Sequence, residues 1–169
     1  QNLKTAKLSE GVQVIEKSAF SYCNNLTTVS MPKSVTTIDD RAFSNCKKLT
    51  GIILPEKLST IGQYTFENCT SIKSIEVPNA VTSIAYGAFN NCSELSTITL
   101  PAKAIKITSR SFNGCENLKT IKYQGSAAEY AKYITPSKVD GFAKAKVEYI
   151  PTLKKVNGKW CYYVNGKFT

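Results

Sequence analysis

AFNNCSELSTITLP, residues 88–101, is one copy of a pattern that recurs along most of the chain. Its aromatic, cysteine and aliphatic positions return every 23 residues without an insertion. The phenylalanines are Phe20, Phe43, Phe66, Phe89 and Phe112, and the cysteines are Cys23, Cys46, Cys69, Cys92 and Cys115. A fixed period of about 20 to 50 residues is typical of repeat proteins, in which each repeat is one stacked structural unit.

Each repeat contains two short extended segments and a turn. Leu26–Met31 alternates apolar and polar residues toward its end, which predicts a strand with one buried face. Pro32 should end this strand, because proline has no N–H group to donate to a sheet. Val35–Ile38 predicts a second extended piece, and we expect the next segment, Asp39–Cys46, to form a short helical or 3₁₀ turn.

A single repeat cannot fold alone. Its apolar side chains contribute roughly 1.5–3 kcal/mol each when buried, whereas ordering each backbone residue costs about 1–2 kcal/mol. Stacked repeats pair their strands in a parallel ladder and cover both faces of each apolar layer. The sequence therefore predicts a solenoid over residues 1–123, with a partial first unit from Leu3 to Leu8 followed by five repeats.

The ends of the solenoid need separate cover. After Tyr123 the pattern weakens, and Gln124 replaces the repeat proline. Ser126 and Glu129 form a capping-box pattern, which predicts a short helix through Ile134. Residues 145–150 alternate and predict a closing strand, so we expect residues 124–151 to be the C-terminal cap. At the other end, we expect further sequence or a cap to cover the first layer.

The motif A-F-x-N-C-x-x-L-x-x-I-x-L-P resembles the BspA-like leucine-rich repeat family, also called the Treponema pallidum type, from Leu3 to about Tyr123. This resemblance implies a right-handed, curved leucine-rich repeat solenoid of β-rich repeats. It also implies a secreted or surface-anchored bacterial protein that adheres to host proteins or other cells. The family supplies no catalytic residue and no cofactor. The chain departs from the motif at Tyr22 and Gly114, which replace asparagine, and at Thr65 and Ser111, which replace alanine.

Residues 152–169 have a different composition, and we interpret them as a linker and a truncated aromatic hairpin. The sequence Val-Asn-Gly-Lys occurs at residues 156–159 and again at residues 164–167. Each Asn-Gly pair favours a type I′ turn, so residues 160–164 should form a strand between two tight turns. This segment resembles the start of the aromatic repeats of choline- or glucan-binding proteins, which bind the cell wall.

The cysteines permit two interpretations. An even number, six, in an extracellular protein favours disulfides. Five of them, however, share one repeat position, so their side chains should point the same way in successive layers, which does not suit a disulfide bridge. We therefore expect a column of buried, reduced thiols that act as small apolar groups. Cys161 lies outside this column, and we expect it to be exposed and reactive.

Composition limits the chemistry. The chain has no histidine and no C-x₂-C pair, so we expect no metal site and no Ser-His-Asp or Cys-His nucleophile. Asp39 and Asp40 form an adjacent acidic pair, which we interpret as a solvated turn. The net charge of +10 comes almost entirely from lysine, because Arg41 and Arg110 are the only arginines. This composition favours anionic wall polymers or host surfaces over nucleic acid, and we expect no membrane span in this sequence.

The outward residues of the first strand of each repeat should form the binding surface, on the concave face of the solenoid. They form two columns of mostly small or hydroxylated side chains. One column is Ser30, Ile53, Glu76, Thr99 and Lys122, and the other is Thr28, Gly51, Ser74, Thr97 and Thr120. The expected function is a non-enzymatic scaffold that binds surface proteins or glycans in adhesion. The alternatives are a passive spacer and the wall-binding arm of a larger secreted enzyme.

Overall fold

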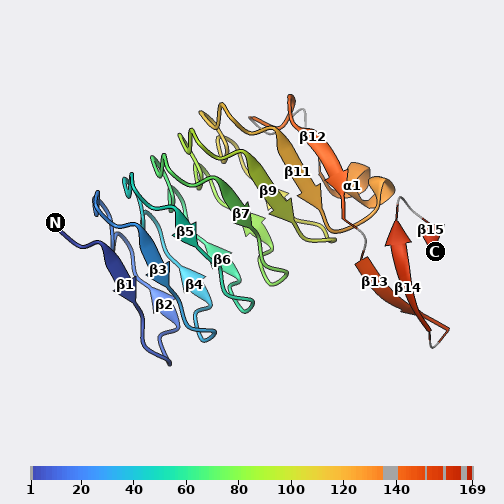
Figure 1. Ribbon diagram of the computed structural model, residues 1–169, viewed down its shortest axis with the longest axis horizontal. Helices are drawn as coiled ribbons and strands as arrows, with labels where there is room; N and C mark the ends of the chain where they lie inside the picture. The colour runs from blue at the N-terminus through green and yellow to red at the C-terminus, as the bar shows by residue number, and fades with distance from the viewer. Residues whose placement is uncertain (1, 135–140, 151, 158, 165–166, 169) are drawn as a thin grey trace.

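The computed structural model, which describes residues 2–134, 141–150, 152–157, 159–164 and 167–168, is a solenoid of stacked layers (Figure 1). Each repeat contributes one strand to each of two sides. The first side holds β1 (Thr5–Lys7), β3 (Thr28–Ser30), β5 (Gly51–Ile52), β7 (Ser74–Glu76), β9 (Thr97–Leu100), β11 (Thr120–Tyr123) and β12 (Lys146–Tyr149). The second side holds β2 (Val14–Ile15), β4 (Thr37–Ile38), β6 (Thr60–Ile61), β8 (Ser83–Ile84) and β10 (Lys106–Ile107).

Strand pairing follows the repeat. All neighbouring strands on the two sides are parallel, and within the repeats each residue pairs with the residue 23 positions away, as in Val29 with Ile52 and Ile98 with Ile121. The predicted solenoid and both predicted strands of each repeat are thus confirmed. The second side is one continuous sheet in the order β10-β8-β6-β4-β2. The first side consists of two sheets, β1-β3-β5 and β12-β11-β9-β7.

The segment between the two strands of successive layers is a series of turns. The amide groups of Ala42 and Cys46 donate hydrogen bonds to the carbonyl groups three residues earlier, as in the predicted 3₁₀ turn. No helix forms there, because Arg41 and Asn45 have left-handed backbones with φ of 55° and 63°. Asparagine tolerates this conformation better than most residues. The Asn68 side chain also donates a hydrogen bond of 3.0 Å to the amide oxygen of Asn45 in the preceding layer.

Two columns of side chains form the core. The repeat phenylalanines stack with nearly parallel rings, for example Phe43 on Phe66 with 5.5 Å between ring centroids. The five repeat cysteines are buried and none of them forms a disulfide, in agreement with the predicted thiol column. Each thiol from the second repeat onward donates to a phenylalanine carbonyl of the preceding repeat, as Cys92 does to Phe66 at 3.1 Å. Burial raises the pKa of Cys46 to about 12, so this thiol is neutral at physiological pH.

The C-terminal cap continues the stack. Helix α1 (Ala127–Tyr133) begins after Ser126, whose side chain forms the predicted capping box with Glu129. Strand β12 closes the first side by pairing in parallel with β11. Phe142 lies on Phe112 with 5.0 Å between ring centroids and thus extends the phenylalanine column by one layer. The cap therefore provides the last repeat with both a neighbouring strand and a neighbouring aromatic ring.

The tail forms a separate antiparallel sheet. Strands β13 (Thr152–Val156), β14 (Lys159–Val164) and β15 (Lys167–Phe168) pair in that order, as the predicted hairpin requires. Asn157, in the first predicted turn, has a positive φ of 49°, as a type I′ turn needs. Residues 158 and 165–166 of the turns, and the side chain of Cys161, lie outside the described part of the structure.

Candidate binding face

The structure brings the predicted site residues together in two rows on the first side, which we call the binding face. Their register is fixed by strand pairing: Ser74, Thr97 and Thr120 are adjacent in one row, and Glu76, Thr99 and Lys122 in the other. These positions alternate with buried residues such as Ile75 and Ile98, so all of them face outward. The predicted members of the binding face are Thr28, Ser30, Ile53, Ser74, Glu76, Thr97, Thr99, Thr120 and Lys122.

Strand pairing extends the binding face at both ends. Lys7 on β1 pairs with Ser30, and Glu148 on β12 pairs with Lys122. Lys146, next to Thr120, forms an ion pair of 3.6 Å with Glu148. The sequence pattern missed the residues of β12 because the helix inserted before this strand changes the repeat spacing. The signal that could have found them is the alternation of residues 145–150, which already predicted the closing strand.

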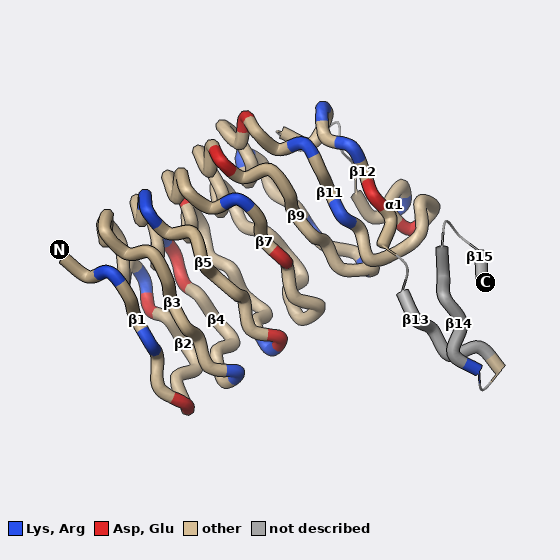
Figure 2. The backbone as a smooth tube through the Cα atoms, in the orientation of Figure 1, with Lys and Arg blue, Asp and Glu red and all other residues tan. Residues whose placement is uncertain are grey.

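Charge is unevenly distributed along the binding face. Basic residues occur toward its two ends, on β1 and on β11, whereas the acidic Glu76 lies at the end of β7 in the middle (Figure 2). The Glu76 carboxylate accepts a hydrogen bond of 3.2 Å from the side chain of Gln124, which stands where other repeats have proline. The face therefore carries lysines on β1 and β11, an ion pair on β12 and an acidic residue in its middle.

The sheet that carries the binding face is interrupted between β5 and β7. At intact junctions the amide of a residue just before the strand donates to the layer below, as Thr50 does to Thr27 at 3.0 Å and Ser96 to Lys73 at 2.9 Å. Between Lys73 and Thr50, both in the described region, no such bond is formed. Gly51 lies at this point, and glycine is a weak strand former because it has no side chain to pack.

Ile53 follows the interruption and is 84% exposed. Two cavities adjoin it, with volumes of about 470 Å³ and about 750 Å³. Both cavities are lined in part by Ile53, Leu54 and Glu56, so they adjoin at these residues. We call the two adjoining cavities together the Ile53 groove. Sequence reasoning placed Ile53 on the binding face, but it did not predict the groove.

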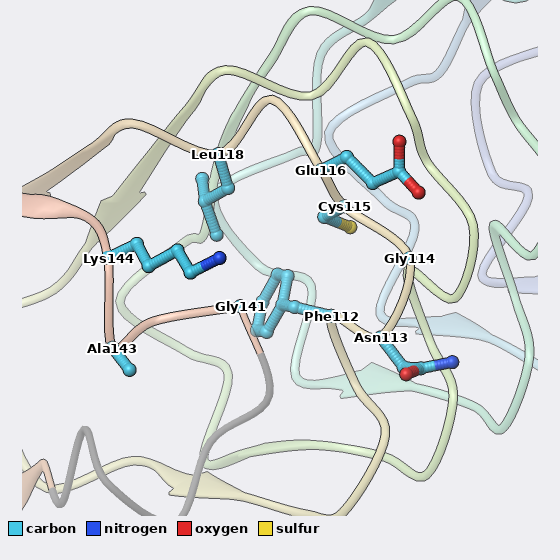
Figure 3. A pocket seen from close by; sticks show the side chains of 9 residues that line it. All are labelled: Phe112, Asn113, Gly114, Cys115, Glu116, Leu118, Gly141, Ala143 and Lys144. Carbon is cyan, nitrogen blue, oxygen red and sulfur yellow. The ribbon is translucent and has the colours of Figure 1, made fainter.

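A third cavity, of about 470 Å³, lies between the last repeat and the cap (Figure 3). Its lining includes Phe112, Cys115 and Leu118 of the last repeat and Gly141 of the cap, and the Lys144 side chain extends toward the Phe112 ring. Cys115 is 5% exposed, slightly more than the other column thiols. None of the predicted binding residues lines this cavity, so it belongs to the capping contact.

The acidic pair Asp39 and Asp40 has a structural role. Both are partly buried rather than fully solvated, which corrects the sequence interpretation. Asp40 accepts a hydrogen bond from the backbone amide of Gln63 in the next layer at 2.6 Å, and Asp39 accepts one from the amide of Asp40. Among the described residues, no three His, Cys, Asp or Glu side chains lie close enough together to hold a metal ion. None of the described helices has the length and hydropathy of a membrane span.

Comparison with known proteins identifies the repeats. The family profile described as "BspA type Leucine rich repeat region" matches residues 1–119 in six copies. The chain belongs to this family. The six copies correspond to the partial first unit and the five full repeats of the sequence pattern. No curated protein sequence matches the chain.

Two solved structures are similar to this BspA-type chain. The Treponema pallidum leucine-rich repeat protein has 33% sequence identity and a TM-score of 0.65, with 70% of this chain and 58% of that chain covered. A leucine-rich repeat protein from Eubacterium ventriosum has 26% identity and a TM-score of 0.67, with 92% and 46% covered. The chain thus spans about half the length of these proteins, and it shares their leucine-rich repeat fold.

Proposed function

We propose that this BspA-type chain is a non-enzymatic binding scaffold, displayed on a bacterial surface, whose binding face adheres to proteins of host or neighbouring cells. The observation that carries the proposal is the register of outward-facing side chains over successive layers, from Thr28 and Ser30 to Thr120 and Lys122. The two parallel sheets of the first side each have one buried side, and together they present these positions as an extended surface. Such a surface suits a macromolecular partner better than a small substrate.

The chemistry of the reactive groups supports a scaffold rather than an enzyme. The thiols of Cys46, Cys69 and Cys92 are fully buried, and burial raises the pKa of each. A cysteine nucleophile needs an accessible thiolate, whereas each of these thiols keeps its proton and donates a hydrogen bond to a backbone carbonyl. The cysteine column therefore holds layers together and is unsuited to attack a substrate.

Surface display is supported by the family and by the tail. The resemblance to BspA-like repeats implies secreted or surface-anchored proteins, and the three-stranded tail resembles the start of a wall-binding aromatic repeat. The basic composition, with 22 Lys and Arg against 12 acidic residues, favours weak attraction to anionic wall polymers. Attachment near the wall would leave the binding face free for other cells.

A binding panel tests the proposal. Immobilised host matrix proteins, mucin-type glycans and purified peptidoglycan would be compared by biolayer interferometry, using the whole chain and a variant with Ser30→Glu, Thr99→Glu and Lys122→Glu. We expect a protein ligand to bind and the triple variant to lose this binding. Thr82→Glu, at an exposed position just before β8 on the second side, is the matched control and should bind normally.

The other outcomes select the alternatives. Binding to glycans alone would replace the protein partner by a carbohydrate. Binding to peptidoglycan alone, unchanged in the triple variant, would support a wall-binding arm of a larger protein. If nothing in the panel binds, the adhesion proposal is wrong for this chain and the passive spacer remains.

A further inference from the structure

We propose that the Ile53 groove is a specific peptide-binding site, which takes an extended segment with an arginine or lysine next to a bulky aliphatic side chain. This proposal rests on the proposed function, since it names a ligand class for one part of the binding face. It starts from three observations at one place: the interrupted sheet, an exposed isoleucine and two carboxylates that form no ion pair with a described side chain.

The apolar part of the groove is unusual for this surface. Most outward positions in the two rows are small or hydroxylated, whereas Ile53 exposes 84% of its surface. Leu54 lines both cavities beside it, and Val77 and Pro78 line the larger one. An exposed isoleucine beside a concave apolar lining gains free energy when a partner covers it, by roughly 25 cal/mol for each Å² removed from water. The groove therefore selects an apolar side chain.

The polar part of the larger cavity is acidic, whereas Lys33 lines the smaller cavity. Glu56 and Glu76 both line the larger cavity, together with the amide side chains of Asn79 and Gln124. In a chain of net charge +10, neither carboxylate forms an ion pair with a described side chain. Gln124 holds Glu76 through a hydrogen bond of 3.2 Å to one carboxylate oxygen. A guanidinium or ammonium group is the ligand complementary to these two carboxylates.

The lining favours a peptide over a carbohydrate. Sugar rings are commonly bound by stacking on aromatic side chains, and all the apolar groups that line the two cavities are aliphatic, sulfur-containing or proline. A peptide, in contrast, can place one aliphatic side chain against Ile53 and an adjacent basic side chain toward Glu56 and Glu76. The long-range repulsion from a basic protein makes such binding depend on this local complementarity.

The probe is the capped tripeptide acetyl-leucyl-arginyl-leucinamide, titrated into the ¹⁵N-labelled chain up to millimolar concentration and followed by NMR. We expect shift changes confined to the backbone amides of Ile53, Leu54, Glu76 and Val77 and their neighbours. The same peptide with citrulline in place of arginine keeps the shape and removes the charge. We expect it to bind about two- to fivefold more weakly, the range for an exposed ion pair.

Variants locate the site. Ile53→Ser and Glu76→Gln change exposed positions, so both variants should fold. Each should raise the dissociation constant of the arginine peptide at least twofold. Lys106→Gln, at an exposed position on β10 of the second side, removes the same charge outside the binding face, so this control should bind the peptide as the parent does. Equal binding of the citrulline peptide, shifts spread over the whole face, or the absence of shifts would overturn the proposal.

Failure here is distinguishable from failure of the proposed function. A panel ligand that is lost with the Ser30, Thr99 and Lys122 changes, but retained by Ile53→Ser and Glu76→Gln, would support the scaffold and exclude the groove as its site. If the tripeptide binds as expected but no protein of the panel binds, the groove is a peptide-binding site and the proposed adhesion to the panel proteins is wrong.

Discussion

The thiol of Cys92 donates a hydrogen bond of 3.1 Å to the carbonyl oxygen of Phe66, 26 residues earlier in the chain. The same carbonyl oxygen accepts a second hydrogen bond of 3.1 Å from the backbone amide of Cys69. One oxygen atom thus joins a turn within its own layer to a side chain of the next layer. The cysteine of the repeat therefore does more than fill space, since it connects the layers through the core.

This relationship predicts an order among substitutions at Cys92. Cys92→Ala removes the sulfur and the hydrogen bond and should lower the free energy of unfolding by about 1–2 kcal/mol. Cys92→Ser keeps a donor for the Phe66 carbonyl and should be less destabilising than Cys92→Ala. Urea denaturation followed by circular dichroism would measure both. If serine is the worse replacement, the thiol contributes by packing alone.

Alkaline pH should weaken the fold through the same column. The pKa of Cys46 is about 12 in the folded protein against an ordinary value of 9.0, because burial disfavours the thiolate. The unfolded chain therefore loses this proton first, and the stabilisation is fully present below pH 9 and is lost as pH rises toward 12. The stability difference between the parent and Cys46→Ala should shrink over this window. Denaturation of both proteins at a series of pH values would measure it. A constant difference from pH 8 to pH 11 would contradict the assignment.

The Phe142 ring should shield the last repeat, and Cys115 in particular, from solvent and thiol reagents. Phe142→Ala removes the ring that lies 5.0 Å from Phe112 and exposes the side of the last layer. In a repeat protein each layer contacts only its neighbours, so the effect should be local. In a Cys161→Ser background, thiol labelling without denaturant should become faster at Cys115, by at least about fivefold, with no change at Cys46. Mass spectrometry of peptides would assign the labelled cysteines, and equal acceleration at both would indicate global unfolding instead.

Tyr22→Asn should stabilise the first layers. Tyr22 is 67% exposed and has a left-handed backbone with φ of 59°, at the position that asparagine occupies in the next three repeats. Asparagine adopts this conformation at lower cost and can accept a hydrogen bond from Asn45, as Asn45 does from Asn68. We expect a gain of about 1 kcal/mol in urea denaturation. Tyr22→Ala, which lacks the amide and the conformational tolerance, is the control and should bring no such gain.

The 23-residue period predicted the strands, the core columns and the outward rows, because stacked layers force equivalent residues into equivalent environments. It did not predict Phe142, which lies 30 residues after Phe112 since the chain of the cap inserts a helix before returning to the stack. Nor did it predict the interruption between β5 and β7. Pairing at that junction depends on backbone positions around Gly51, which the identity of the buried residues does not determine.

The candidate site was predicted as a surface but not as a groove. Alternation along each strand decides which residues point outward, so Ile53 and Glu76 were placed correctly on one face. Glu56 was not singled out because it follows the repeat proline, outside the strand. Gln124 was noted only as a departure from the pattern, whereas its contact with Glu76 spans 48 residues and depends on the stacking of the β9 layer between the layers of β7 and β11.

Inter-layer bonds that link residues 23 or 26 positions apart have a consequence for how such a chain can change in length. Duplicating or deleting one complete unit reproduces every junction with the same partners, so the molecule can grow by recombination in steps of one strand spacing, about 4.8 Å. An insertion of another size shifts the register of both columns, unless the extra residues form an element outside the stack, as α1 does between Phe112 and Phe142. The interrupted junction beside Gly51 and the terminal α1 and β12 elements are the places where this modularity ends.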